Sequence, residues 1–217
     1  HDVETIEGSL DYSYSRLGSV AERMSVYDVK TVEEAQEQMN LEAASSSMFN
    51  AIYLLDEDGN LYSSSYVRIP AAGHAYDEIF SDGRDHFAML YDDEDGRLET
   101  TKESLIYGIK LDGMVIGGRR FVGMLGRSDV SIISDQLMID SFEGQGISSV
   151  VNPYGYYIVS GAPAAADLAG RDNFYNVLET GWLHDGVTIE EVRRNIAEGQ
   201  SFVIYCTTVS GEELVMS

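Results

Sequence analysis

Cysteine and basic residues are both scarce in this sequence of 217 residues. Its one cysteine, Cys206, excludes an intramolecular disulfide framework and a zinc site built from cysteines. The chain has 14 basic and 37 acidic side chains, which gives a formal net charge of -23. A charge of this sign and size repels nucleic acid phosphates and anionic lipid head groups. We therefore expect no nucleic acid partner and no role at a membrane surface.

Long apolar runs are absent as well. No segment approaches the roughly 18–20 apolar residues that a membrane-spanning helix needs. The chain carries no signal peptide pattern, and its two ends suggest an excised fragment. Hydrophobic residues still make up 44% of the sequence, which is enough for a packed core. We expect a globular part of a longer protein.

Apolar side chains recur with a period of seven in the first thirty residues. Seven of the eight residues at two heptad sites are apolar or aromatic: Val3, Leu10, Leu17 and Met24 occupy one site, and Ile6, Ser13, Val20 and Tyr27 occupy the other. This stripe predicts one long N-terminal helix, which pairs with a second copy as a coiled coil or lies on the chain's own body. Gly8 and Gly18 each weaken the helix by roughly 1 kcal/mol relative to alanine, so packing has to hold it.

Two capping boxes mark the start of further helices. Residues 31–34 read Thr-Val-Glu-Glu, a pattern in which the threonine and the last glutamate exchange hydrogen bonds between side chain and backbone. They predict a helix from residue 32 to about residue 47. Residues 188–191 repeat the signature and predict a helix that is closed by Gly199.

Two strand–turn–strand patterns of the same design lie about 96 residues apart, with turns at residues 56–59 and 152–155. Each turn has an aspartate or asparagine three residues before a glycine, which is free to take positive φ. Both patterns predict β-hairpins. An irregular stretch follows each hairpin, at residues 69–85 and 161–186, and further strands come after it. This repetition argues for a duplicated unit.

The further strands and one connecting helix complete the expected organisation. Strands are expected at residues 86–91, 104–110 and 114–126 (the last broken by Gly117 and Gly118) in the first copy, and at residues 202–209 and 212–216 in the second. Residues 129–140 predict a helix that joins the two copies.

These features resemble the double Cache domains of bacterial membrane receptors. The resemblance is carried by the long N-terminal helix, by the turn at residues 56–59, by the strand exit at residues 121–131 and by the second hairpin at residues 150–160. It covers nearly the whole chain and implies an α/β (α+β) fold with two tandem PAS-like units, each with a central antiparallel sheet flanked by helices. The implied parts are a helical stalk at residues 1–49, a membrane-distal sensing unit at residues 50–128, and a bridging helix with a membrane-proximal unit at residues 129–217.

Double Cache domains are extracytoplasmic sensors of histidine kinases, diguanylate cyclases and chemoreceptors, so the resemblance implies that role here. Residues 103–109 and 148–151 are most similar to domains attached to histidine kinases, often hybrid ones. The resemblance implies a small-molecule ligand such as an amino acid or organic acid, a homodimer in the full receptor, and contact with the membrane only through spanning helices outside this sequence. The alternative from another class is a surface adhesion or interaction module, which predicts a broad exposed apolar patch and no enclosed polar pocket.

The resemblance also implies positions for a ligand. Cache domains that bind amino acids have an Arg-x-Trp-Tyr pattern at the start of a central strand and an aspartate at a strand exit. Here residues 84–87 read Arg-Asp-His-Phe, and an arginine in this place can bind a carboxylate with two parallel hydrogen bonds. For each arginine of the first copy, the alternative is a surface position that offsets neighbouring acids. The candidate ligand-binding residues are Arg68, His74, Tyr76, Arg84, His86, Tyr91, Tyr107, Arg120 and Asp129, with Tyr66 in the same unit.

Templates for catalysis and for metal binding are missing. The sequence has no His-Glu-x-x-His helix, no Gly-x-Ser-x-Gly elbow and no phosphate-binding loop. A calcium loop that starts at Asp56 fails because its sixth position is Leu61, where a glycine is required. Cys206 lies in an apolar strand pattern and is expected to be a buried strand residue. We expect no catalytic residue, no metal and no cofactor, so this chain itself is not an enzyme.

Overall fold

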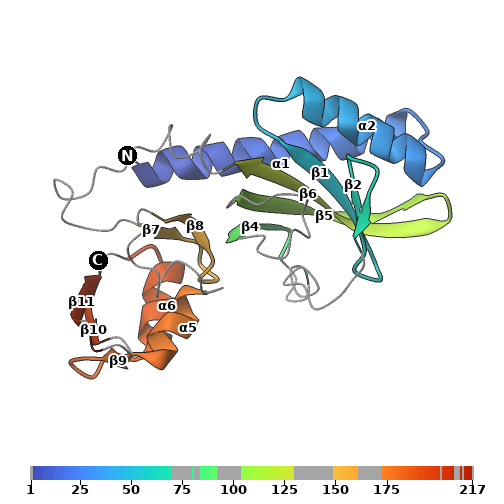
Figure 1. Cartoon of the computed structure of the whole chain (residues 1–217). Coiled ribbons are helices and arrows are strands. Elements are labelled where there is room, and N and C mark those ends of the chain that lie inside the picture. The colour runs from blue at the N-terminus through green and yellow to red at the C-terminus, as the bar shows by residue number, and fades with distance from the viewer. Residues whose placement is uncertain are drawn as a thin grey trace. The chain divides into compact units, whose positions relative to one another are not determined.

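The computed structural model describes residues 2–69, 80, 84–91, 104–129, 149–160, 173–200, 202–207, 211 and 213–216. Contacts within the chain divide it into two compact units, His1–Ile139 and Asp140–Ser217. The described elements of the first unit are α1 (Asp2–Val26), α2 (Val32–Ser45), β1 (Ala51–Asp56), β2 (Leu61–Ser63), β3 (Arg68–Ile69), β4 (His86–Tyr91), β5 (Ser104–Ile116) and β6 (Arg119–Asp129) (Figure 1). The finer division that the sequence predicts, at residues 49 and 128, stays a prediction.

The six described strands of the first unit form one antiparallel sheet in the order β3-β2-β1-β6-β5-β4. The first strand therefore lies in the middle, between its hairpin partner β2 and the last strand, β6. Strand β5 joins β6 to β4. A central antiparallel sheet behind a long N-terminal helix confirms the predicted α+β fold class.

Both helices of the first unit contact this sheet, α1 at β5 and β6 and α2 at β1 and β2 (Figure 1). Leu17, Val20 and Met24 of the heptad stripe are at most 1% exposed, whereas Tyr27 is 64% exposed. The part of the stripe from Leu17 to Met24 therefore packs on the chain's own body and is not available to a second copy. The burial of these side chains compensates for the helix-weakening Gly18.

The helix-side face of the sheet is densely packed around Gly126 of β6. A Cβ atom there would lie 2.8 Å from the Tyr107 ring and 2.9 Å from the Phe49 ring. The Tyr107 hydroxyl hydrogen bonds with Ser128, whose hydroxyl donates to the Met48 carbonyl. These contacts fix β5 and β6 to the segment that connects α2 with β1.

The prediction of one interrupted strand at residues 114–126 is wrong. Residues Ser104–Ile116 form a single strand, and β6 begins only at Arg119. Between them Gly117 and Gly118 have φ of +59° and +76°, and Ile116 pairs with Arg119. Two consecutive residues with positive φ form the type I′ turn of a two-residue hairpin. The glycine pair is thus a hairpin turn between two long strands.

One aspartate fixes the turn after β1. Asp56 Oδ1 accepts the backbone N–H of Asp58 at 3.0 Å and that of Asn60 at 2.8 Å. Gly59, at φ +82°, donates its own N–H to the Asp56 carbonyl at 3.0 Å. The first predicted hairpin is confirmed.

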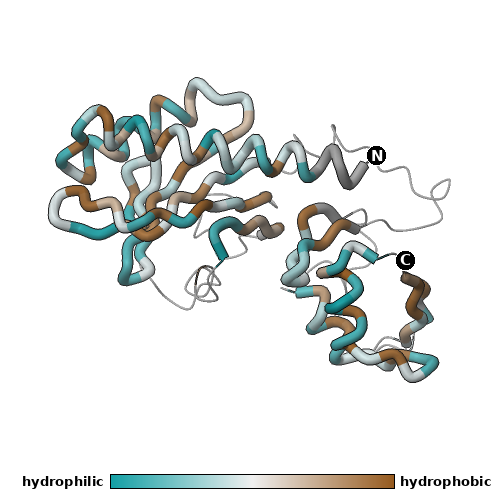
Figure 2. The backbone as a smooth tube through the Cα atoms, turned by 180° about the vertical axis from the view of Figure 1, so that it is seen from behind, coloured by the Kyte–Doolittle hydropathy of each residue, from teal (hydrophilic) through white to brown (hydrophobic). Residues whose placement is uncertain are grey.

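The described elements of the second unit are β7 (Ser149–Val151), β8 (Tyr157–Ser160), α5 (Phe174–Thr180), β9 (Trp182–Leu183), α6 (Ile189–Ala197), β10 (Ile204–Thr207) and β11 (Glu213–Met216). Strands β7 and β8 pair as a hairpin, and the other three form a sheet in the order β11-β10-β9. Tyr175, Leu178, Val192 and Ile204 make a small apolar core. Hydrophilic and hydrophobic positions alternate along α6, as expected for a helix with one buried side (Figure 2).

The second turn repeats the hydrogen bonds of the first. Asn152 Oδ1 accepts the backbone N–H groups of Tyr154 and Tyr156, both at 3.0 Å. Gly155, at φ +89°, donates to the Asn152 carbonyl at 2.9 Å. The second predicted hairpin is confirmed, and the two copies share one turn down to individual hydrogen bonds.

Helix predictions based on capping boxes are confirmed, but one helix was not expected. Both threonines, Thr31 and Thr188, form complete capping boxes, and Gly199 follows α6 with φ +63°. Residues 161–186 were expected to be irregular, yet α5 lies within them. Its N-cap is Asn173, whose side chain accepts the Tyr175 N–H at 2.9 Å. A single capping asparagine before a helix of two turns is a weaker signal than a capping box.

Candidate functional site

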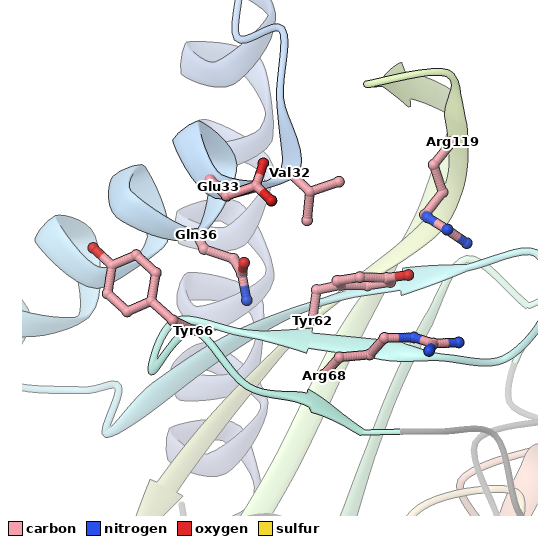
Figure 3. A pocket seen from close by; sticks show the side chains of 7 residues that line it. All are labelled: Val32, Glu33, Gln36, Tyr62, Tyr66, Arg68 and Arg119. Atoms are coloured by element: carbon pink, nitrogen blue, oxygen red, sulfur yellow. The ribbon is translucent and has the colours of Figure 1, made fainter.

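A polar pocket of about 400 Å³ lies in the first unit, between the start of α2 and the edge of the sheet at β2 and β3. Figure 3 shows the two arginines that line it at one end, on either side of the Tyr62 ring, and the side chains of α2 and Tyr66 toward the other end. The lining residues are Val32, Glu33, Gln36, Tyr62, Tyr66, Arg68 and Arg119.

The capping box places the helical wall of this pocket. Because α2 begins at Val32, its first turns carry Val32, Glu33 and Gln36 to the sheet edge. Gln36 is 6% exposed, and its Nε2 donates to the Ser63 carbonyl at 2.9 Å. A buried polar side chain is stable only with such partners, so this bond fixes the start of α2 against β2.

The strand wall depends on an unusual backbone conformation at Tyr66. This residue has φ of +66°, and its N–H donates to the Ser63 carbonyl at 3.0 Å. Bulky residues rarely adopt positive φ, which costs on the order of 1–3 kcal/mol and recurs at functional sites. The turn leaves the Tyr66 ring 54% exposed beside the pocket and brings Arg68 onto β3.

A network of charged and amide groups holds the two arginines that line the pocket. The fully buried Asp56 carboxylate accepts from Arg119 at 2.9 Å and from the Asn60 amide at 2.9 Å. The Asn60 carbonyl oxygen in turn accepts from Arg68 at 3.0 Å. The Arg119 guanidinium also lies over the Tyr62 ring, 5.3 Å from its centroid. The aspartate that fixes the first turn thus also holds the arginine side of the pocket.

Of the residues predicted from sequence, Arg68 and Tyr66 lie in this pocket and the other described candidates lie elsewhere in the unit. His86 stacks on Tyr14 of α1 with ring centroids 4.7 Å apart. Burial raises the pKa of Tyr107, whose hydroxyl lies in the helix-side core.

The remaining described candidates lie outside the pocket. The Arg120 guanidinium lies beside Gly113 of β5, where a Cβ atom would be 2.8 Å from it. The Asp129 backbone N–H donates to Asn50 Oδ1 at 2.7 Å, and Arg84 lies partly buried before β4. Tyr91 ends β4, but its side chain, like His74 and Tyr76, lies outside the described residues. Among the described residues, Arg84, Arg120 and Asp129 do not line the pocket.

Sequence reasoning missed five lining residues: Val32, Glu33, Gln36, Tyr62 and Arg119. The glycine pair at residues 117–118 could have indicated that Arg119 begins a strand, because a two-residue hairpin turn is followed directly by the next strand. For Gln36 the signal is a polar side chain between the apolar residues Ala35 and Met39.

No protein-family model and no curated protein sequence matches this chain. Solved structures do resemble it. The periplasmic sensory domain of the Campylobacter jejuni chemoreceptor Tlp1 is 15% identical, with a TM-score of 0.51 over 98% of this chain and 82% of that one. The extracellular domain of mmHK1S-Z3, which is described as a histidine kinase, is 11% identical, with a TM-score of 0.53 over 98% of this chain and 86% of that one. An extracellular ligand-binding receptor from Desulfohalobium retbaense is 12% identical, with a TM-score of 0.50 over 83% of this chain and 33% of that one.

This chain has the fold of bacterial extracytoplasmic sensory domains. The fold shared with these domains extends over 98% of this chain, in agreement with the expected architecture. Within the described parts of the chain, no helix has the length and apolar character needed to cross a bilayer.

Proposed function

We propose that this chain is the extracytoplasmic sensory domain of a bacterial transmembrane receptor, and that its first unit binds a small molecule. The sensory-domain fold together with a polar pocket in the first unit is the observation that carries this proposal. The chain itself is a binding module without catalytic chemistry. It lies on the outer side of the plasma membrane, to which helices outside this sequence attach it.

Finer parts of the proposal follow the sequence. We assign residues 1–49 to a helical stalk, residues 50–128 to the distal sensing unit and residues 129–217 to the bridging helix with the proximal unit. A histidine kinase is the favoured output, with a diguanylate cyclase or a chemoreceptor as the alternative. Both histidine kinase and chemoreceptor domains occur among the similar structures, so the fold supports either.

The pocket suggests how a ligand acts on the helices. A molecule in it touches both the start of α2 and the β2–β3 edge, so it favours the arrangement in which α2 is held against the sheet. Further along α2, the Glu42 carboxylate accepts from Arg23 of α1 at 2.7 Å. A change in α2 therefore reaches the N-terminal helix. The ligand shifts this equilibrium only by its difference in affinity for the two arrangements, about 10⁴-fold for a nearly complete switch.

A thermal-shift screen of amino acids, organic acids and amines against the 217-residue chain tests the binding function. A ligand at 100 times its Kd stabilises the folded chain by about 2.7 kcal/mol, which raises Tm by several degrees. Reading the gene on both sides of these residues tests the receptor assignment, since membrane-spanning helices are expected there. A gene without spanning helices, or a screen without any stabilising compound, would contradict the proposal.

One observation favours a second candidate function, a surface-interaction module. Trp182, Tyr205 and Val215 are 78%, 52% and 65% exposed. Tyr205 pairs with Val215, and Trp182 pairs with Thr207, which lies two residues after Tyr205 on β10, so all three project from the same side of the β9–β11 sheet. Self-association in analytical ultracentrifugation that Trp182→Ser abolishes, with no response in the ligand screen, would favour this candidate over the sensor.

A further inference from the structure

We propose that the pocket beside α2 binds a monocarboxylate through Arg68, an inference that rests on the proposed sensory function and names its class of ligand. The two arginines in the pocket are in different electrostatic situations. The charge of Arg119 is compensated by the fully buried Asp56 carboxylate at 2.9 Å. Arg68 donates to the neutral amide of Asn60 at 3.0 Å, and no carboxylate among the described residues lies within ion-pair distance of it.

Among the described residues, the exposed Arg68 is therefore the guanidinium of this pocket that no carboxylate compensates. Arg68 is bound through a single nitrogen in the described structure, so its planar fork of N–H groups retains donors for two parallel hydrogen bonds. A carboxylate fits that fork in geometry and in charge. In a chain of net charge -23, such a local positive charge is also what an anion needs in order to approach.

The walls limit the ligand to one negative charge and an apolar body. Glu33 is exposed on the helical wall, and its carboxylate opposes a second anionic group. Val32 and the Tyr62 ring supply apolar surface between this glutamate and the arginines, and the Tyr66 ring lies toward the opposite end of the pocket (Figure 3). A volume of about 400 Å³ holds a ring or a short chain beside the carboxylate.

Four probes with one phenyl body separate charge from shape. Isothermal titration of the 217-residue chain at pH 7 and low salt compares phenylacetate, phenylacetamide, phenylethylamine and phenylsuccinate. We expect phenylacetate to bind at least about 10-fold more tightly than the uncharged amide, because hydrogen bonds to charged groups are the stronger ones. Phenylsuccinate, with two carboxylates, and the amine are expected to bind more weakly than phenylacetate. Equal binding of acid and amide, or no binding of the acid, would overturn the inference.

Substitutions locate the site. Arg68→Gln should weaken phenylacetate about 10- to 100-fold, and Arg68→Lys should recover only part of this loss because an ammonium lacks the planar fork. Arg194→Gln, the same change at an exposed position of the second unit, should leave the affinity within about twofold. If some compound of the broad screen stabilises wild type and Arg68→Gln equally, the sensory function stands and this inference fails. If no compound stabilises the chain, the proposed function fails as well.

Discussion

Because the two turns have the same hydrogen bonds, the contribution of the Asp56 charge to stability can be measured by comparison with the neutral Asn152. Asp56→Asn keeps both backbone hydrogen bonds of the first turn, so it makes that turn a chemical copy of the second. The substitution removes the carboxylate that Arg119 binds. It places an amide N–H₂ group opposite the Arg119 guanidinium and the Asn60 amide, which are both donors. Breaking a buried pair costs about 3–5 kcal/mol. Because Arg119 is 39% exposed and can turn to water, we expect about 2–3 kcal/mol for Asp56→Asn.

The series is completed by two alanine variants. Asp56→Ala also removes the acceptor for the turn and should cost about 3–4 kcal/mol, whereas Asn152→Ala, with neutral and partly exposed bonds, should cost about 1 kcal/mol. Urea unfolding followed by circular dichroism gives the free energies, and hydrogen exchange of peptides from each unit shows which unit has lost stability. The reasoning is refuted if Asp56→Asn costs no more than Asn152→Ala, or if exchange increases in the second unit instead of at β1 and β2.

Three further predictions concern packing, pH and the contact between the helices. Gly126→Ala should destabilise the chain by about 1–3 kcal/mol in urea unfolding through overpacking, while Gly18→Ala, whose Cβ meets nothing closer than 4.0 Å, should stabilise it by about 0.5–1 kcal/mol. Burial raises the pKa of both Tyr107 and Tyr14 above the usual value near 10, so the stability that these neutral phenols contribute is present below that pH. It should fall by about 1.4 kcal/mol per pH unit per tyrosine above pH 10, and urea midpoints of Tyr107→Phe should fall less steeply. Glu42→Gln should lower the free energy of unfolding by about 1 kcal/mol in thermal melts, because Glu42 binds an arginine of α1 at 2.7 Å.

Features that depend on neighbouring residues were predictable from the sequence. Both capping boxes, at Thr31 and Thr188, follow from four consecutive residues whose groups bond one another. The turns at Asp56 and Asn152 follow in the same way, because the acceptor, the two donors and the glycine lie within five residues. The heptad stripe predicted α1, but it did not determine whether the stripe meets a second copy or the chain's own sheet.

The pocket was not predictable by the same means because its walls come from distant segments. Asp56 and Arg119 are 63 residues apart in sequence, and Gln36 reaches the Ser63 carbonyl across 27 residues. Only the pairing of β1 with β6 and the packing of α2 on β2 bring these groups together. The selection of Arg68 from sequence was based on the scarcity of basic residues, and the same argument selected Arg120, which the structure places outside the pocket.

Divergence between the two copies gives a reason to place the ligand in the first. Both copies keep the turn after their first strand, since its hydrogen bonds are needed in each. The charges around that turn are not kept. In the first unit the turn carries Asp56, whose carboxylate binds Arg119 at the start of β6; in the second unit the turn carries the neutral Asn152. A purely structural turn needs no buried ion pair, as the second copy shows. In the first unit this carboxylate fixes Arg119 and, through Asn60, Arg68 beside the pocket, which is the arrangement that the proposed ligand site requires.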